Sequence, residues 1–177
     1  MPHIMEMKKD GYHGQKAIEI PATIISAYCL KNPLVAGAYI TNIGYYSGPP
    51  SHYRVYHKGI DQHILVYNTA GEGWMEIDDQ RYDIRPGDFF IAPAGKHNCY
   101  ASSEKKPWTI YWLHFKGPMA DAAVASFYEQ NHSYLGNVSF NQHRLKIFDK
   151  MYQHLECGFG YDTLTHVNMI LPQFLNS

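Results

Sequence analysis

The sequence predicts a mainly β domain followed by helices, and three observations support this prediction. First, short apolar runs between residues 18 and 115 are separated by Gly, Pro and Asp, which is typical of strands joined by turns. Second, this punctuation thins after residue 118, where the apolar spacing becomes helical. Third, 177 residues with 45% hydrophobic and 18% charged side chains are sufficient for one domain with a buried core.

Seven segments have the apolar, β-branched and aromatic composition of strands. They are residues 24–27, 39–43, 63–68, 74–77, 82–84, 89–92 and 108–115. In the turn at 85–88, Pro86 restricts one φ angle and Gly87 accepts a positive one, and residues 78–81 form a hairpin connection. Seven strands with short connections predict a sandwich or a barrel.

The last of these strands has two large apolar faces. Alternation places Trp108, Ile110, Trp112 and His114 on one face, and Thr109, Tyr111, Leu113 and Phe115 on the other. Leaving either face in water would expose an extensive apolar patch. We therefore expect one face to line the interior of the β unit and the helices to cover the other.

Three helices are expected after the strands, at residues 119–129, 142–155 and 163–171. Asn141 and Asp162 are candidate N-caps, and Gly158 can end the middle helix. Pro172 should stop or kink the last helix, because proline lacks the backbone N–H and clashes with the preceding turn.

The second and third of these helices carry apolar stripes. The stripes consist of Leu145, Phe148, Tyr152 and Leu155 in one helix, and of Leu164, Val167 and Leu171 in the other. Part of each stripe is expected to cover the β unit, and the family resemblance described below implies that the stripes also form the contact surface between two subunits.

Charge and cysteine content exclude several classes of protein. Fifteen Lys and Arg against sixteen Asp and Glu leave a net charge of -1, which makes this segment a poor DNA binder by itself. Cys29, Cys99 and Cys157 are odd in number and widely spaced, so they predict neither a disulfide framework nor a Cys-x-x-Cys metal site. Residues 1–15 have no apolar run of the signal-peptide type, and no later stretch is long enough to span a membrane. We expect a cytoplasmic protein.

The stretch from Gly71 to His97, GEGWMEIDDQRYDIRPGDFFIAPAGKH, resembles the central repeat of the cupin superfamily. The later stretch PWTIYWLHF at 107–115, with the helical tail behind it, narrows the resemblance to the ligand-binding domain of AraC-type transcriptional regulators. This resemblance extends from about Tyr39 to the end of the sequence. It implies a cupin-like jelly-roll β-barrel that senses a small molecule, followed by C-terminal helices that pair two subunits into a homodimer.

The resemblance also implies a division of the chain into three parts. These are a flexible N-terminal arm at 1–16, a cupin-like ligand-binding barrel at 17–117 and a helical dimerisation segment at 118–177. In such regulators a helix-turn-helix region binds the DNA, and the sequence up to Ser177 does not contain it. The expected partners are therefore a small-molecule effector, with a carbohydrate as one candidate, a second copy of the chain, and DNA only through that missing region.

The same resemblance places a tryptophan of the last strand and a tyrosine after the Pro-x-Gly turn in contact with the ligand. These residues match Trp112 and Tyr100, which can stack on a ring and donate a hydrogen bond. Arg54 is the candidate for a basic ligand-binding residue, with Tyr56 as the alternative occupant of that position. Two further candidates are Trp108, which could instead only fill the barrel, and His97, which could orient a ligand through one ring nitrogen.

A catalytic metal is not expected. Metal-bearing cupins present a His-x-His pair and a Glu before the glycine turn and another His after it, and this sequence keeps only the last, His97. Ile64 and Leu65 lie where the Glu would be. We therefore expect no cofactor and no enzymatic activity. The acidic residues Glu72, Glu76, Asp78, Asp79 and Asp83 are interpreted as a solvent-facing surface.

Two other interpretations remain open. One is a metal-dependent cupin enzyme, an isomerase or oxygenase of a small metabolite, in which His97, His63 and His114 converge on a metal ion. The other is a purely structural dimer whose barrel is packed shut and binds no ligand.

Overall fold

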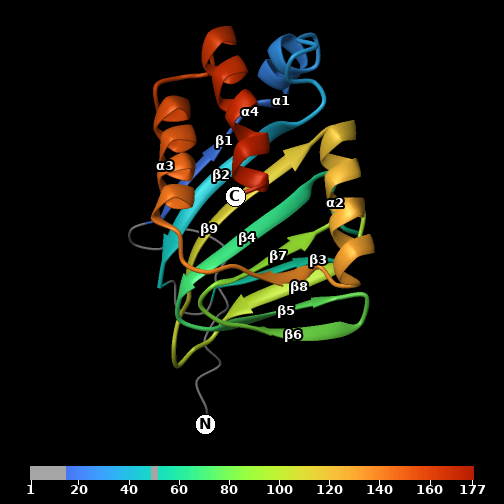
Figure 1. Cartoon of the computed structure of the whole chain (residues 1–177), viewed down its shortest axis with the longest axis vertical. Helices are drawn as coiled ribbons and strands as arrows, with labels where there is room; N and C mark the ends of the chain where they lie inside the picture. The colour runs from blue at the N-terminus through green and yellow to red at the C-terminus, as the bar shows by residue number, and fades with distance from the viewer. Residues whose placement is uncertain (1–14, 49–51) are drawn as a thin grey trace.

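The computed structural model describes residues 15–48 and 52–177. Nearly all of the expected N-terminal arm, and most of the loop at 48–51, lie outside these residues. The β strands form two antiparallel sheets, and three helices cover the larger sheet (Figure 1).

The larger sheet contains six strands in the order β1-β2-β9-β4-β7-β10. Their bounds are β1 (Lys16–Glu19), β2 (Tyr39–Ser47), β9 (Thr109–Lys116), β4 (His63–Ala70), β7 (Asp88–Ala92) and β10 (Leu135–Asn137). The smaller sheet has the order β3-β8-β5-β6, with β3 (Tyr53–Tyr56), β8 (Asn98–Ser102), β5 (Gly73–Ile77) and β6 (Gln80–Ile84). Without the edge strands β1 and β10, this is the strand order of an eight-stranded jelly roll, which confirms the predicted fold class.

Four of these strands were not expected from the sequence: β1, β3, β8 and β10. In β8 the polar residues Asn98 and Ser102 are buried, so the segment lacks an apolar alternation. Conversely, the strand expected at 24–27 is wrong. These residues form the short helix α1 (Ala22–Ile24) and the π-helical turn η1 (Ile25–Cys29). The neighbouring isoleucines favour a strand locally, but both pack against the core from the helical turns.

The expected helices are present as α2 (Pro118–Asn131), α3 (Gln142–Glu156) and α4 (Tyr161–Leu175). Asn141 caps α3 as predicted, because its side-chain oxygen accepts a hydrogen bond from the backbone N–H of His143 at 2.8 Å. Asp162 is not a cap, since α4 begins after Gly160. The helix does not stop at Pro172, one of the two outcomes predicted there: it continues to Leu175, and Asn176 N–H bonds to the Pro172 carbonyl at 3.1 Å.

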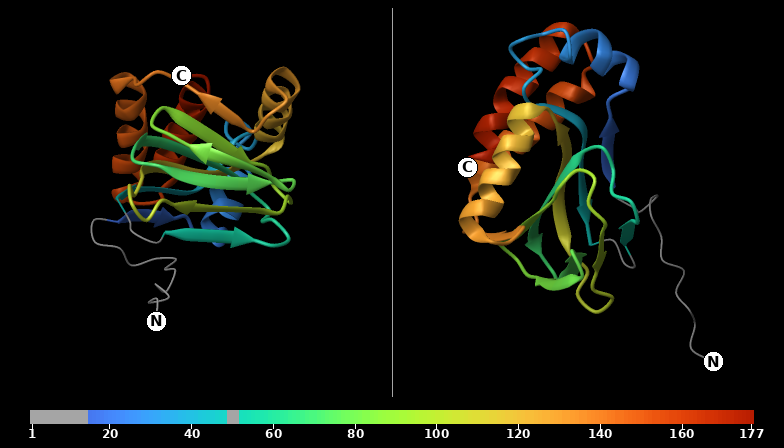
Figure 2. Two further views of the ribbon diagram at one scale, coloured as in Figure 1. Left: turned by 90° about the horizontal axis from the view of Figure 1, so that it is seen from below. Right: turned by 90° about the vertical axis from the view of Figure 1, so that its right-hand side faces the viewer.

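The helices pack on one face of the six-stranded sheet, and the smaller sheet lies on the opposite side (Figure 2). The Tyr111 ring on β9 contacts Phe148 of α3 with centroids 5.0 Å apart, which confirms that helices cover this face. A buried hydrogen bond of 2.8 Å from the Ile40 N–H to Asn168 Oδ1 joins β2 to α4. None of the helices in the described residues combines the length and apolar composition that a membrane span requires.

The apolar stripes of α3 and α4 are buried within the chain, which corrects the expectation that they form the contact between subunits. Phe148, Leu155, Leu164, Val167 and Leu171 belong to the same core as the sheet. The apolar surface that was expected to mediate dimerisation instead covers the outer face of the sheet. These side chains are therefore not available for a contact with a second subunit.

Candidate functional site

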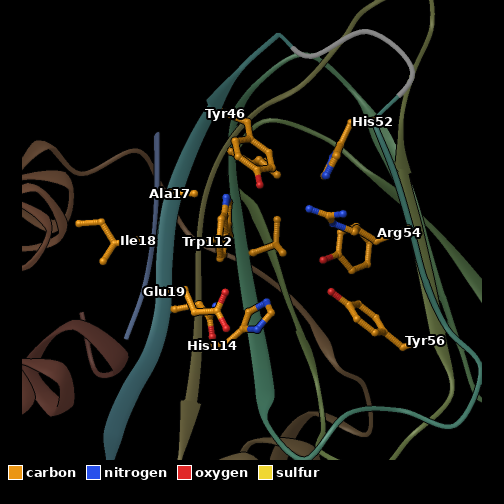
Figure 3. Close-up of a pocket in the computed structure, with 13 residues that line it drawn as sticks. Ala17, Ile18, Glu19, Tyr46, His52, Arg54, Tyr56, Trp112 and His114 are labelled. Carbon is orange, nitrogen blue, oxygen red and sulfur yellow. The ribbon is translucent and has the colours of Figure 1, made fainter. Parts of the chain in front are cut away.

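A cavity of about 440 Å³ lies between the two sheets, within the size range of small-molecule sites. Side chains from both sheets point into it, including Tyr46, Arg54, Trp112 and His114 (Figure 3). The inward residues of β9 are Ile110, Trp112 and His114, as the alternation predicts. Unlike these, Glu19 on the edge strand β1 is exposed, so its carboxylate lies at the mouth of the cavity.

Trp112 forms one wall of the cavity because a glycine lies beside it on the neighbouring strand. Gly44 on β2 pairs with Trp112 on β9, and a Cβ atom at Gly44 would lie only 2.3 Å from Trp112 Cζ2. The indole ring also contacts Tyr46, with centroids 5.4 Å apart. Its Nε1 is buried, and within the described residues it has no hydrogen-bond partner. A buried N–H in this position is available to a ligand.

Arg54 and Tyr100 are neighbours across the smaller sheet and line the opposite side of the cavity. Tyr56 lies two residues from Arg54 on the same strand face and also lines the cavity, so both candidates for this position are present. Burial, followed by the neighbouring Tyr56, raises the pKa of Tyr100, and its phenol therefore keeps its proton. The guanidinium and the phenol are both suited to donate hydrogen bonds to ligand oxygens.

His114 is held in a hydrogen-bond network at the β1 side of the cavity. Gln62 Oε1 lies 3.1 Å from His114 Nδ1 and accepts a hydrogen bond from Thr41 Oγ1 at 2.5 Å. Desolvation lowers the pKa of His114 to about 4, and the positive charge of Arg54 contributes to this shift. The imidazole is therefore neutral near pH 7. Since Nδ1–H donates to Gln62, Nε2 remains a hydrogen-bond acceptor.

The low pKa of His114 predicts a loss of stability in acid. Between about pH 6.5 and pH 4, His114 takes up a proton in the unfolded chain but not in the folded one. Its contribution to the free energy of unfolding is therefore complete above pH 6.5 and decreases by up to about 3 kcal/mol as the pH falls to 4. Urea unfolding at a series of pH values should show a weaker pH dependence for His114→Gln. The exposed His143→Gln serves as the control, and equal slopes for both variants would contradict this assignment.

Trp108 and His97, the other two candidate ligand-binding residues, lie outside the cavity lining. Trp108 is fully buried behind it and donates a hydrogen bond from Nε1 to Nδ1 of the cavity residue His52 at 3.3 Å. His97 is exposed, because alternation along the chain into β8 turns Tyr100 inward and residue 97 outward. The structure thus brings together Trp112, Tyr100 and Arg54.

The sequence analysis did not identify the cavity-lining polar residues Glu19, Asn42, Tyr46 and His52, or Gln62, which bonds to His114. The alternation along 39–47 is a signal that could have identified Tyr46, whereas Glu19 and Gln62 reach the site only through strand pairing and loop placement.

The three histidines of the enzyme interpretation do not converge. His63 accepts a hydrogen bond from the Ala94 N–H at Nδ1, and its Nε2 lies 2.7 Å from Asp121 Oδ1 on α2. His97 is on the outer surface, and only His114 is in the cavity. A metal site of that composition is therefore incompatible with the fold.

Residues 41–166 match the model of the family described as AraC-like ligand binding domain. The chain is 30% identical over 107 residues to the MmsAB operon regulatory protein of Pseudomonas aeruginosa, covering 58% of this chain and 34% of that protein. It is 25% identical over 113 residues to the Msm operon regulatory protein of Streptococcus mutans, covering 63% and 38%. This chain therefore spans about a third of the length of these curated relatives.

A solved structure described as the AraC-like transcriptional activator CuxR is similar at 13% identity, with a TM-score of 0.42, covering 82% of this chain and 54% of that one. The family assignment rests on the family model, which covers well over half of the chain, from within β2 through α3, and most of the cavity-lining residues. The chain belongs to the AraC-like ligand-binding domain family.

Proposed function

We propose that this chain is the effector-sensing domain of a transcriptional regulator and has no enzymatic activity. A small molecule binds in the cavity between the sheets, and its binding controls a DNA-binding region outside this chain. The observation that carries the proposal is the buried Nε1–H of Trp112, which faces the cavity and has no hydrogen-bond partner within the described residues. A ligand acceptor atom would satisfy it. The two curated relatives, named as operon regulatory proteins, support the regulatory role.

The chemistry of the cavity favours a small ring that carries several oxygen atoms, such as a carbohydrate or a sugar acid. The indole face of Trp112 can stack on the C–H side of such a ring. Arg54 and the protonated Tyr100 donate hydrogen bonds, while neutral His114 offers an acceptor for a hydroxyl group.

Signal transmission requires that the ligand change the arrangement of the helices. Trp112 and Gly44 are paired across β9 and β2, and β2 is joined to α4 through Ile40 and Asn168. A differential binding free energy of about 1–3 kcal/mol is sufficient for such coupling. We further propose a homodimer formed by exposed residues of α3 and α4, such as Met169, because the apolar stripes are occupied within the chain.

A thermal-shift screen of sugars, sugar acids and aromatic metabolites tests the proposal. A ligand at about 100 times its Kd should stabilise the domain by about 2.7 kcal/mol, which raises the Tm by roughly 5–10 °C for a domain of this size. If no compound of these classes raises the Tm, the proposal that the cavity binds such a molecule is wrong.

A further inference from the structure

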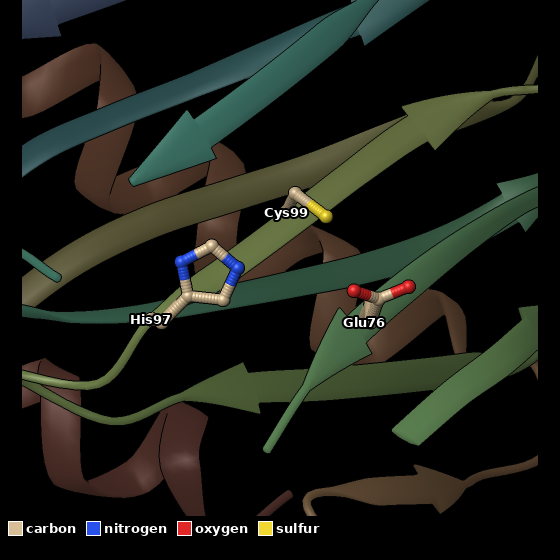
Figure 4. A group of neighbouring side chains, drawn as sticks. All are labelled: Glu76, His97 and Cys99. Carbon is tan, nitrogen blue, oxygen red and sulfur yellow. The ribbon is translucent and has the colours of Figure 1, made fainter. Parts of the chain in front are cut away.

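Glu76, His97 and Cys99 form a compact group on the outer face of the smaller sheet (Figure 4). One potential ligand atom from each residue lies within 4.8 Å of the other two. Strand pairing explains this proximity: Glu76 on β5 is directly opposite Cys99 on β8, and His97 lies two residues before Cys99 and therefore on the same side of the chain. Tyr100 points to the other side, so the sheet separates this group from the ligand cavity.

The ring of His97 is oriented in the way that metal-binding histidines usually are. Its Nδ1 lies 3.3 Å from the backbone carbonyl oxygen of His57, to which it can donate a hydrogen bond. The proton on Nδ1 leaves Nε2 with a lone pair. In Figure 4 one ring nitrogen is on the side of Cys99 and Glu76, and the other is on the far side. A hydrogen bond from the second nitrogen to a carbonyl is the common support of a metal-bound imidazole.

We propose that the Cys99 thiolate, the His97 imidazole and the Glu76 carboxylate bind a divalent transition-metal ion of the zinc type. Sulfur and nitrogen ligands favour zinc over calcium or magnesium, which prefer oxygen. Three protein ligands leave one position of a tetrahedral site for water. With bonds of about 2.0–2.3 Å, the ligand atoms of such a site are roughly 3.3–3.8 Å apart. In the structure the ligand atoms lie within 4.8 Å of one another. Side-chain rotation of the exposed His97 and the half-buried Glu76 can bring them to the shorter spacing of a metal site.

In the metal-free chain the Cys99 thiol keeps its proton. Burial, and then the Glu76 carboxylate, raise the pKa of the Cys99 thiol. A bound cation would replace the thiol proton, and binding should release protons and become tighter as the pH rises.

The site is testable with the full chain after removal of metals by a chelator. Titration with Zn²⁺ against a chromophoric chelator should give one tight equivalent, and Co²⁺ in its place should produce the absorption of a thiolate-bound ion. We expect Cys99→Ser to abolish this absorption and to weaken Zn²⁺ binding more than about tenfold, as losses at metal sites commonly do. Cys157→Ser is the matched control, because Cys157 is an exposed thiol at the end of α3 and should leave both signals unchanged.

Because Cys99 is buried, His97→Gln provides a second variant at an exposed position, and it should weaken Zn²⁺ binding to the same degree. The proposal is overturned if the unmodified chain shows no stoichiometric Zn²⁺ binding. It is also overturned if His97→Gln binds Zn²⁺ as tightly as the unmodified chain, which would point to another pair such as His154 and His166, whose ring centroids are 4.6 Å apart.

Discussion

Replacing Trp112 with alanine is expected to weaken ligand binding by about 10- to 100-fold, or roughly 1.4–2.8 kcal/mol. The substitution removes both the stacking surface and the buried Nε1–H that we assign to a ligand acceptor. The fold should survive, because the side chain is only half-buried and faces a cavity. The measurement is the Kd, obtained by calorimetric titration, of any compound that raises the Tm of the unmodified chain.

Trp74→Ala is the matched control for this prediction. Trp74 lies in the smaller sheet outside the ligand cavity, where the guanidinium of Arg81 stacks over its ring at 3.9 Å. Its removal should leave the Kd unchanged. Undiminished affinity in Trp112→Ala would remove this residue from the binding site and with it the main support for the proposed function.

Trp108→Ala should have the largest effect on stability and lower the free energy of unfolding by about 3–5 kcal/mol. Trp108 is completely buried, and its ring packs over Gly73, where a Cβ atom would lie 2.2 Å from Trp108 Cε3. Alanine leaves a large cavity and also removes the donor to His52 Nδ1. For a domain of this size the loss corresponds to a Tm lower by roughly 6–20 °C.

Trp108→Phe separates the two causes, because it keeps most of the packing and removes only the hydrogen bond to His52. We expect it to retain most of the stability, with a loss of about 1–2 kcal/mol. Denaturant unfolding of both variants measures these values. A Tm for Trp108→Ala within 2 °C of that of the unmodified chain would correspond to a loss of less than about 1 kcal/mol. This result would show that the Trp108 ring is not part of the stabilising core.

Much of the site was predictable where a local rule applies. The period of two in residues 108–115 placed Ile110, Trp112 and His114 on one face, and these residues line the cavity. The turn at 85–88 has the conformation that its residue types predict. Gly87 has a φ of 92°, and the Asp88 carboxylate accepts a hydrogen bond from the Arg85 N–H at 2.7 Å. The position of α3 follows from the Asn141 cap and the apolar stripe.

Local rules failed where a partner far along the chain determined the conformation. The polar segment β8 is a strand because β3 and β5 bond to it on both sides. The segment at 22–29 is helical because its isoleucines reach the core in that form. Trp108 and His97 lie outside the cavity lining for a related reason: whether a side chain reaches the cavity depends on its neighbours in the fold as well as on strand alternation.

The sequence by itself determined a sandwich or barrel, the helices behind it and the inward face of β9, because alternation and helical spacing depend only on nearby residues. The tertiary structure alone decided that Arg54 and Tyr100 are paired across one sheet, that Gly44 makes room for Trp112, and that Glu76 meets Cys99. These contacts join segments separated by many residues. The register of the strands is set by the burial of whole sheet faces. No single segment carries the information that determines it.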